Sequence, residues 1–289
     1  MKLALPGFTE HFATLAPRYD IVLCDVWGVV HNSIVSVPTA CEALARFRMQ
    51  GGTVVLITNA PRPGAAVLRH LDELHVARDV YDGIVSSGDV TRGVIAHRAG
   101  QSAFHIGPER DLGIFAGLDV RLDSAEAADY VVCSGLFDDD VETPDDYREV
   151  LTRLQARGLH MICANPDLVV ERGSRLIYCA GALADLYHSI GGEVLFSGKP
   201  HRPIYDEALA KASELRGQKV ALARTLAIGD SVRTDLKGAA NFGVDCLFVT
   251  AGIHAEELGS RDQPDIGALG AIFAAAGTVP TAVMRQLAW

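Results

Sequence analysis

Short apolar runs rich in β-branched residues alternate along this chain with longer amphipathic stretches, and this alternation constrains the fold more than any other feature. Helix-length stretches such as Pro38–Arg48, which Gly51 and Gly52 terminate, and Gly64–Leu74 separate the runs. Apolar strands joined by crossover helices predict an α/β protein with parallel sheets covered on both faces. The eight runs, which are compatible with one sheet or with two, are Ile21–Cys24, Thr53–Ile57, Ala103–Ile106, Tyr130–Cys133, His160–Cys163, Val194–Phe196, Leu226–Ile228 and Cys246–Val249.

The composition excludes several classes of protein. With 26 basic and 36 acidic side chains the net charge is −10, which disfavours binding to nucleic acid or to anionic lipid. No run reaches the ~18 apolar residues needed to cross a bilayer, and the first six residues lack a secretory signal. The six cysteines are scattered without a C-x-x-C pair, as in a reducing compartment. We therefore expect a cytoplasmic protein that binds neither nucleic acid nor a membrane.

Polar side chains come directly after four of the predicted strands. In open parallel sheets, ligands bind beyond the carboxyl ends of the strands. A carboxylate nucleophile, a hydroxyl, an ammonium group and metal-binding carboxylates are the groups that phosphoryl transfer through an aspartyl-phosphate requires. Each residue alone is more typical of a turn, a helix cap or a solvated charge, but their joint placement favours the catalytic interpretation. In chain order they are Asp25, then Thr58 with Asn59, then Lys199, then Asp230 with Asp235.

These residues give the chain a resemblance to the haloacid dehalogenase superfamily, and within it to subclass IIA, the capped sugar-phosphatase-like hydrolases. Asp25 is similar to the family nucleophile, and Thr58 to the phosphate-binding residue of the second motif. Lys199 is similar to the lysine of the third motif. Asp230 and Asp235, within Gly-Asp-Ser-Val-Arg-Thr-Asp, are similar to the acidic fourth motif. The resemblance covers most of the chain.

The resemblance also implies two domains. The second and third motifs lie 141 positions apart (199 − 58), which leaves room for an inserted domain. The segment Asn165-Pro166-Asp167, with Gly181-Ala182 and Gly191-Gly192 downstream, is similar to the subclass cap. The predicted fold is a doubly wound parallel sheet core of the haloacid dehalogenase type, Rossmannoid in topology, with a large inserted α/β cap domain. The predicted core consists of residues 1–86 and 192–289, and the predicted cap of residues 87–191.

The cofactor that the resemblance implies is Mg²⁺. A phosphate group and Asp25 repel each other, so a cation is needed between them. Asp25 and Asp230 are the expected carboxylate ligands, and the backbone oxygen of Trp27 is the expected third protein ligand. Asp235 is expected behind them, where it would hold metal-bound water or the motif lysine.

The remaining motif residues are expected to bind the phosphate. Lys199 would neutralise both Asp25 and the phosphoryl oxygens, while Thr58, Asn59 and nearby backbone N–H groups would orient the phosphate. The resemblance thus makes Asp25, Lys199 and Thr58 catalytic.

Trp27 is a departure from the family. Phosphatases of this family usually carry a second aspartate two residues after the nucleophile, which protonates the leaving alcohol and then activates water. Tryptophan does neither, and a positioned general acid is worth ~10²–10⁴ in rate. Three outcomes stay open: substrates with good leaving groups, a proton supplied by another residue, or a pocket that binds without turnover. His31 is the nearest titrating candidate, although it is equally compatible with a solvated or packed histidine.

We therefore expect a Mg²⁺-dependent phosphomonoester hydrolase that acts on a small phosphorylated metabolite through an aspartyl-phosphate and that is slowed by Trp27. A sugar phosphate is the substrate that the subclass suggests. The alternatives are a non-hydrolytic phosphometabolite-binding protein and a phosphotransferase on the same scaffold. The sequence does not decide the oligomeric state, and a homo-oligomer is compatible with it.

Overall fold

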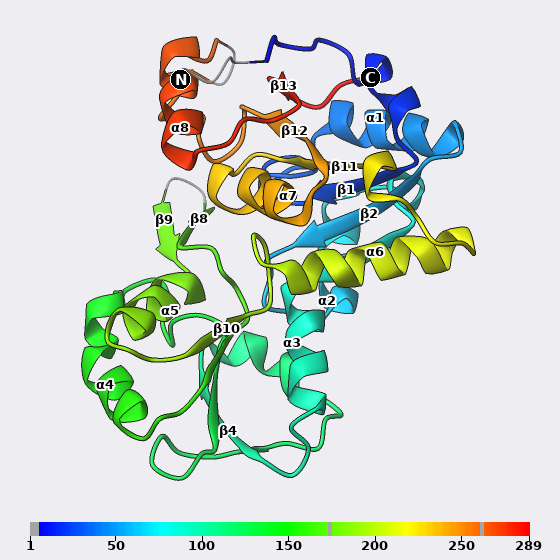
Figure 1. The fold of residues 1–289 in the computed structure, drawn as a ribbon. Coiled ribbons are helices and arrows are strands. Elements are labelled where there is room, and N and C mark those ends of the chain that lie inside the picture. Colours follow the sequence, from blue (N-terminus) through cyan, green and yellow to red (C-terminus); the bar gives the residue numbers. More distant parts are fainter. Residues whose placement is uncertain (1–5, 173–174, 261–262) are drawn as a thin grey trace. The chain divides into compact units, whose positions relative to one another are not determined.

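The computed structural model describes residues 6–172, 175–260 and 263–289, and the chain forms two compact units (Figure 1). The first unit contains Met1–Thr58, Leu68–Val85 and Tyr205–Trp289, and the second contains Asn59–Val67 and Ser86–Ile204. The domain boundaries predicted from the sequence stay a prediction. Residues 1–5, on which the expectation about a secretory signal depends, lie outside the described residues.

The first unit is built on a six-stranded sheet with the order β13-β12-β11-β1-β2-β3. In this order, each strand from β13 to β2 is parallel to the neighbouring strand with which it is paired. Its strands are β1 (Ile21–Asp25), β2 (Thr53–Thr58), β3 (Gly83–Ser86), β11 (Thr225–Gly229), β12 (Asp245–Val249) and β13 (Ala282–Met284). The helices of this part of the chain are α1 (Pro38–Met49), α2 (Gly64–Glu73), α6 (Arg202–Arg216), α7 (Lys237–Phe242) and α8 (Ile266–Ala276), of which α2 and α6 begin in residues of the second unit.

The central strands of this sheet are buried along their whole length. Every residue of β1 and β2 is buried, as expected for strands covered on both faces. On one face, Leu44 and Phe47 of α1 pack in the same cluster as Val22 and Val54. Burying a side chain of this size stabilises the fold by roughly 1.5–3 kcal/mol. The strand ends that carry the predicted site residues therefore project from a rigid layer.

The second unit has a sheet of its own. Five parallel strands have the order β10-β7-β6-β4-β5, and β8 and β9 form a separate antiparallel hairpin. The strands are β4 (Ser102–Ile106), β5 (Arg121–Leu122), β6 (Tyr130–Cys133), β7 (Met161–Cys163), β8 (Val169–Arg172), β9 (Arg175–Tyr178) and β10 (Val194–Phe196). The helices are α3 (Ser87–Ala96), α4 (Arg148–Ala156) and α5 (Ala180–Ser189).

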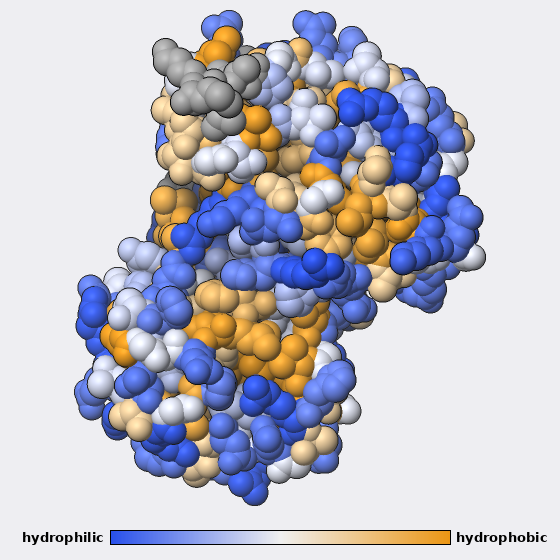
Figure 2. Space-filling model, in the orientation of Figure 1, coloured by the Kyte–Doolittle hydropathy of each residue, from blue (hydrophilic) through white to orange (hydrophobic). Residues whose placement is uncertain are grey.

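The helices of the second unit cover its sheet on two sides. Leu151 of α4 and Leu183 of α5 pack with Val131 in one cluster, and Ile95 of α3 packs with Val132 in another. On the face shown in Figure 2, the surface of this unit is mainly hydrophilic, with an apolar area between α5 and α3. Among the described residues, no helix is long and apolar enough to cross a membrane.

Residues 59–67, which are the loop after β2 and the first residues of α2, are part of the second unit although they come directly after β2. The Gly88 N–H donates to the Ala60 carbonyl at 3.1 Å, and a Cβ atom on Gly88 would lie 2.3 Å from the Arg62 carbonyl oxygen. The Arg62 guanidinium pairs with the buried Asp111 carboxylate at 3.0 Å. The loop therefore packs on the start of α3 at Gly88, an approach that only glycine permits, and is also held by the ion pair with Asp111.

The α/β class and the parallel sheets predicted from the sequence are confirmed. All eight predicted strands form, within one or two residues of the predicted bounds, and α1 and α2 also match. Five strands of the described part of the chain were not predicted from the sequence, because they are short, exposed or polar: β3, β5, β8, β9 and β13.

Candidate active site

The carboxyl ends of three neighbouring strands meet at one edge of the six-stranded sheet. Asp25 is the last residue of β1 and is paired in register with Ile57, so Thr58 at the end of β2 lies beside it. On the other side of β1, Cys24 is paired with Ile228 of β11, and Asp230 comes directly after that strand. The order β11-β1-β2 therefore places two carboxylates and one hydroxyl together.

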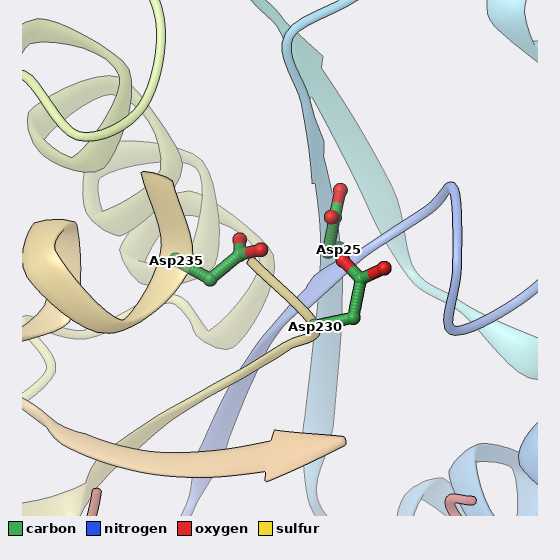
Figure 3. Close-up of side chains that lie close together, drawn as sticks. All are labelled: Asp25, Asp230 and Asp235. Carbon is green, nitrogen blue, oxygen red and sulfur yellow. The ribbon is translucent and has the colours of Figure 1, made fainter. Parts of the chain in front are cut away.

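Asp25, Asp230 and Asp235 form a buried acidic cluster. One carboxylate oxygen of each lies within 4.8 Å of the others, and the three residues are 7%, 2% and 2% exposed. Figure 3 shows Asp25 and Asp230 side by side, with Asp235 projecting towards them from the helical turn Val232–Leu236. Carboxylates buried so closely repel one another, and a divalent cation with its preference for oxygen ligands would offset that repulsion. The cluster therefore fits a divalent metal ion.

Backbone N–H groups hold the three carboxylates in place. The N–H of the residue after Asp25 donates to its Oδ1 at 2.7 Å. Ile253 donates to Oδ2 of Asp230 at 2.7 Å, and Ser231 donates to Oδ2 of Asp235 at 3.1 Å. These three hydrogen bonds fix the orientation of the carboxylates at the edge of the sheet.

Two glycines enclose Asp230. A Cβ atom on Gly28 would lie 2.0 Å from Oδ2 of Asp230, and one on Gly252 would lie 1.8 Å from the same atom. Gly28 also has φ +83°, in the left-handed region that glycine adopts readily. Any larger side chain at either position would displace the carboxylate.

The turn after β1 explains what Trp27 does structurally. Its indole N–H donates to Oγ of Ser33 at 3.0 Å, and the ring is half-buried. The next N–H, of Gly28, donates to the His31 carbonyl at 2.8 Å. Trp27 thus stabilises the turn through its one side-chain donor, and an indole, whose N–H is not acidic, supplies no proton to a leaving group.

His31 is not placed to supply that proton either. It is 5% exposed, and its Nδ1 accepts a hydrogen bond from the Ser33 N–H at 2.9 Å, which requires an unprotonated Nδ1. Burial, together with the neighbouring His70, whose ring centre is 5.4 Å away, lowers the pKa of His31 to about 4. At neutral pH the imidazole is therefore uncharged and a poor general acid.

Asn59 and Lys199 belong to the second unit, where they are joined to each other. The Lys199 N–H donates to Oδ1 of Asn59 at 2.7 Å, and Nδ2 of Asn59 donates to the Lys199 carbonyl at 3.1 Å. Lys199 is 2% exposed and Asn59 is 4% exposed. The structure thus brings three of the predicted site residues together in the acidic cluster of Asp25, Asp230 and Asp235, and Thr58 lies on the strand beside Asp25. Two more predicted residues, Asn59 and Lys199, are hydrogen-bonded to each other in the second unit.

Comparisons with known proteins decide the family. The sequence model of haloacid dehalogenase-like hydrolases matches residues 22–121, and a second, HAD-hydrolase-like model matches residues 196–268. A solved hydrolase of the haloacid dehalogenase-like family from Brucella suis 1330 is 48% identical, with a TM-score of 0.86, over 97% of this chain and 100% of that one. This chain is a haloacid dehalogenase-like hydrolase.

Two further relatives of this hydrolase are phosphatases by name. The ribonucleotide monophosphatase NagD of Escherichia coli K12 is 26% identical over 81% of this chain and 88% of its own length. The glycerol phosphate phosphatase Rv1692 of Mycobacterium tuberculosis, solved in complex with calcium, is 24% identical with a TM-score of 0.63, over 83% of this chain and 68% of that one. The second likeness shows a shared fold.

One segment of the site in this hydrolase was not predicted from the sequence, Gly252-Ile253-His254. Besides the contacts with Asp230, Nε2 of His254 accepts a hydrogen bond from the Val232 N–H at 3.2 Å, and its Nδ1 is bonded to Glu257 at 2.9 Å. The segment begins three residues after β12, which is paired with β11. Its position just beyond the predicted strand Cys246–Val249 is the sequence signal that could have found it.

Proposed function

We propose that this hydrolase is a Mg²⁺-dependent phosphomonoesterase that acts on a small phosphorylated metabolite, with Asp25 as the nucleophile. The buried cluster of Asp25, Asp230 and Asp235 at the edge of the sheet is the observation that carries the proposal. The phosphatase names of NagD and the glycerol phosphate phosphatase support the reaction class, and the calcium in the latter supports a divalent ion.

The carboxylates of Asp25 and Asp230 would hold the ion, with the backbone oxygen of Trp27 as a further ligand, and Asp235 would orient its water. When bound, the ion supplies the positive charge that lets a carboxylate approach a phosphate. In the first step an Asp25 oxygen bonds to phosphorus, and the bond from phosphorus to the ester oxygen breaks. Water then attacks that phosphorus, which releases inorganic phosphate and restores the carboxylate.

The leaving oxygen in the first step needs a proton, and the turn after β1 does not provide one. The indole N–H of Trp27 is not acidic and donates to Ser33, and His31 is uncharged at neutral pH. We therefore propose that the enzyme favours esters whose leaving group is stable as an anion. Alkyl esters should be slower than aryl esters by about 10²–10⁴-fold, the usual contribution of a general acid.

The test is hydrolysis of an aryl phosphate and an alkyl phosphate, each with Mg²⁺ and with a chelator, by wild type and by Asp25→Asn. We expect Mg²⁺-dependent cleavage of the aryl ester, slow cleavage of the alkyl ester and no cleavage by Asp25→Asn. Equal rates for both esters would mean that another residue acts as the acid. No cleavage of any phosphate ester, with phosphate binding retained, would favour a phosphometabolite-binding protein. Faster turnover when a second alcohol is added would favour phosphotransfer.

A further inference from the structure

The side chain of Asn59 uses every hydrogen-bonding group of its amide within the second unit. One Nδ2 hydrogen is donated to Oδ1 of Asp167 at 2.9 Å and the other to the Lys199 carbonyl at 3.1 Å, while Oδ1 accepts from the Lys199 N–H. An amide has two N–H donors, and here both are occupied. The side chain therefore has no donor left for a phosphate, and only the Asn59 backbone N–H can serve the predicted phosphate-binding role.

The contact with Lys199 fixes that residue at two points. Paired bonds to the N–H and the carbonyl of one residue restrict both the position and the rotation of its backbone, as in a β-ladder. The neighbouring Gly198 makes the approach feasible, because a Cβ atom there would lie 2.4 Å from Oδ1 of Asn59 and 2.7 Å from Cδ of Pro166. A larger residue before the lysine would force the amide away.

Asp167 is anchored in turn by its own backbone. Its N–H donates to Oδ1 of Asn165 at 3.1 Å, and its carbonyl accepts from the Gly181 N–H at the start of α5, also at 3.1 Å. A Cβ atom on Gly181 would lie 2.4 Å from that carbonyl oxygen. Asp167 thus joins a rigid helix start to the Asn59 amide, and this gives the Asn165-Pro166-Asp167 segment a role.

We propose that Asn59 is a positioning residue for Lys199 and that Asp167 is the anchor that sets the Asn59 amide. The inference rests on the proposed function, because it takes the Lys199 ammonium to be the group that neutralises the phosphate. A carboxylate at position 167 accepts the Nδ2 hydrogen and so favours the amide orientation that presents Oδ1 to the Lys199 N–H. Loss of either residue should therefore act through the lysine.

A double-mutant cycle separates positioning from direct contact with substrate. Hydrolysis of p-nitrophenyl phosphate and binding of inorganic phosphate by calorimetry, both with Mg²⁺, are measured for wild type, Asn59→Ala, Lys199→Ala and the double variant. Asn59→Ala should lower kcat by about 10²-fold, the cost of a misplaced catalytic group. In the Lys199→Ala background the same change should cost less than about threefold, because residues that act as a unit are not additive. Equal losses in both backgrounds would overturn the inference and leave the proposed function standing.

The anchor is tested with a conservative pair of variants. Asp167→Ala should lower kcat by about tenfold, the value of one hydrogen bond, with little change in Mg²⁺ affinity. Asp167→Asn keeps an oxygen acceptor at the same place and should recover most of the rate. Asn241→Ala and Asp119→Ala, both at exposed positions, are the matched controls, and thermal unfolding checks the fold of each variant. Equal losses for Asp167→Ala and Asp167→Asn would refute the anchoring role. A wild type that neither cleaves the ester nor binds phosphate would overturn the proposed function and the inference together.

Discussion

Replacing Gly252 with alanine should dislodge the Asp230 carboxylate. The new Cβ atom would lie 1.8 Å from Oδ2 of Asp230, and ordinary contact begins at 3.4 Å, so this atom must move by about 1.6 Å (3.4 − 1.8). The Ile253 N–H holds the same oxygen at 2.7 Å, so the loop and the carboxylate cannot both keep their places. The backbone of Gly252 is outside the left-handed region, and alanine therefore adds no backbone strain. A misplacement of ~1 Å can cost ~10²-fold, and we expect at least that loss of Mg²⁺-dependent activity.

The assay measures p-nitrophenyl phosphate hydrolysis against Mg²⁺ concentration, with Mg²⁺ affinity measured by calorimetry. Overpacking of this kind should also lower the free energy of unfolding by about 1–3 kcal/mol, which denaturant titration measures. Gly93→Ala is the matched control, because a Cβ atom on Gly93 meets no heavy atom within 4 Å, and its activity should not change. If Gly252→Ala kept wild-type Mg²⁺ affinity and turnover, Asp230 would not be a ligand held between two glycines.

The acidic cluster, the turn after β1 and the buried histidines each give a further prediction. Asp230→Ala should weaken Mg²⁺ binding and abolish hydrolysis, and unchanged affinity by calorimetry would remove Asp230 from the metal site. Trp27→Asp should narrow the ~10²–10⁴-fold gap between aryl and alkyl esters, and an unchanged gap in a folded variant would exclude position 27 as the place of the missing acid. Burial lowers the pKa of both His31 and His105 to about 4, below the ordinary value of 6.5, so the unfolded chain binds more protons between these limits and stability is lost as the pH falls. The free energy of unfolding, measured with urea, should fall by roughly 2–3 kcal/mol for each histidine between pH 7 and pH 4.5. A double variant with His31→Asn and His105→Asn should lose less over this range, and an equal loss would contradict the prediction.

Much of the fold could be predicted because parallel strands impose a simple pattern. Central strands buried on both faces read as continuous apolar runs, and β1 and β2 are buried throughout. Residues at the carboxyl ends of such strands share one edge of the sheet, so the proximity of Asp25 and Asp230 could be inferred from the sequence. Short exposed strands such as β5 (Arg121–Leu122) carry no such pattern and were missed.

The site details that escaped prediction depend on distant contacts. The amide of Asn59 pairs with a residue 140 positions later, and no local pattern distinguishes that contact from a bond to phosphate. The low pKa of His31 arises from burial and from His70, on a helix that the sequence does not place beside it. Gly252 looks like any loop glycine until the structure shows Asp230 within 1.8 Å of its missing Cβ atom.

The packing of residues 59–67 has a consequence for exchanging caps between related enzymes. A chimera joined only at residues 86 and 204 would keep residues 59–67 of the recipient enzyme and pack them against the donor's equivalent of α3. If the donor has any residue other than glycine at the position of Gly88, a Cβ atom there would lie 2.3 Å from the Arg62 carbonyl oxygen. If the donor has no acidic residue at the position of Asp111, the Arg62 guanidinium would lose its ion-pair partner. The transferable module is therefore discontinuous, and a working graft has to carry its own copy of the loop.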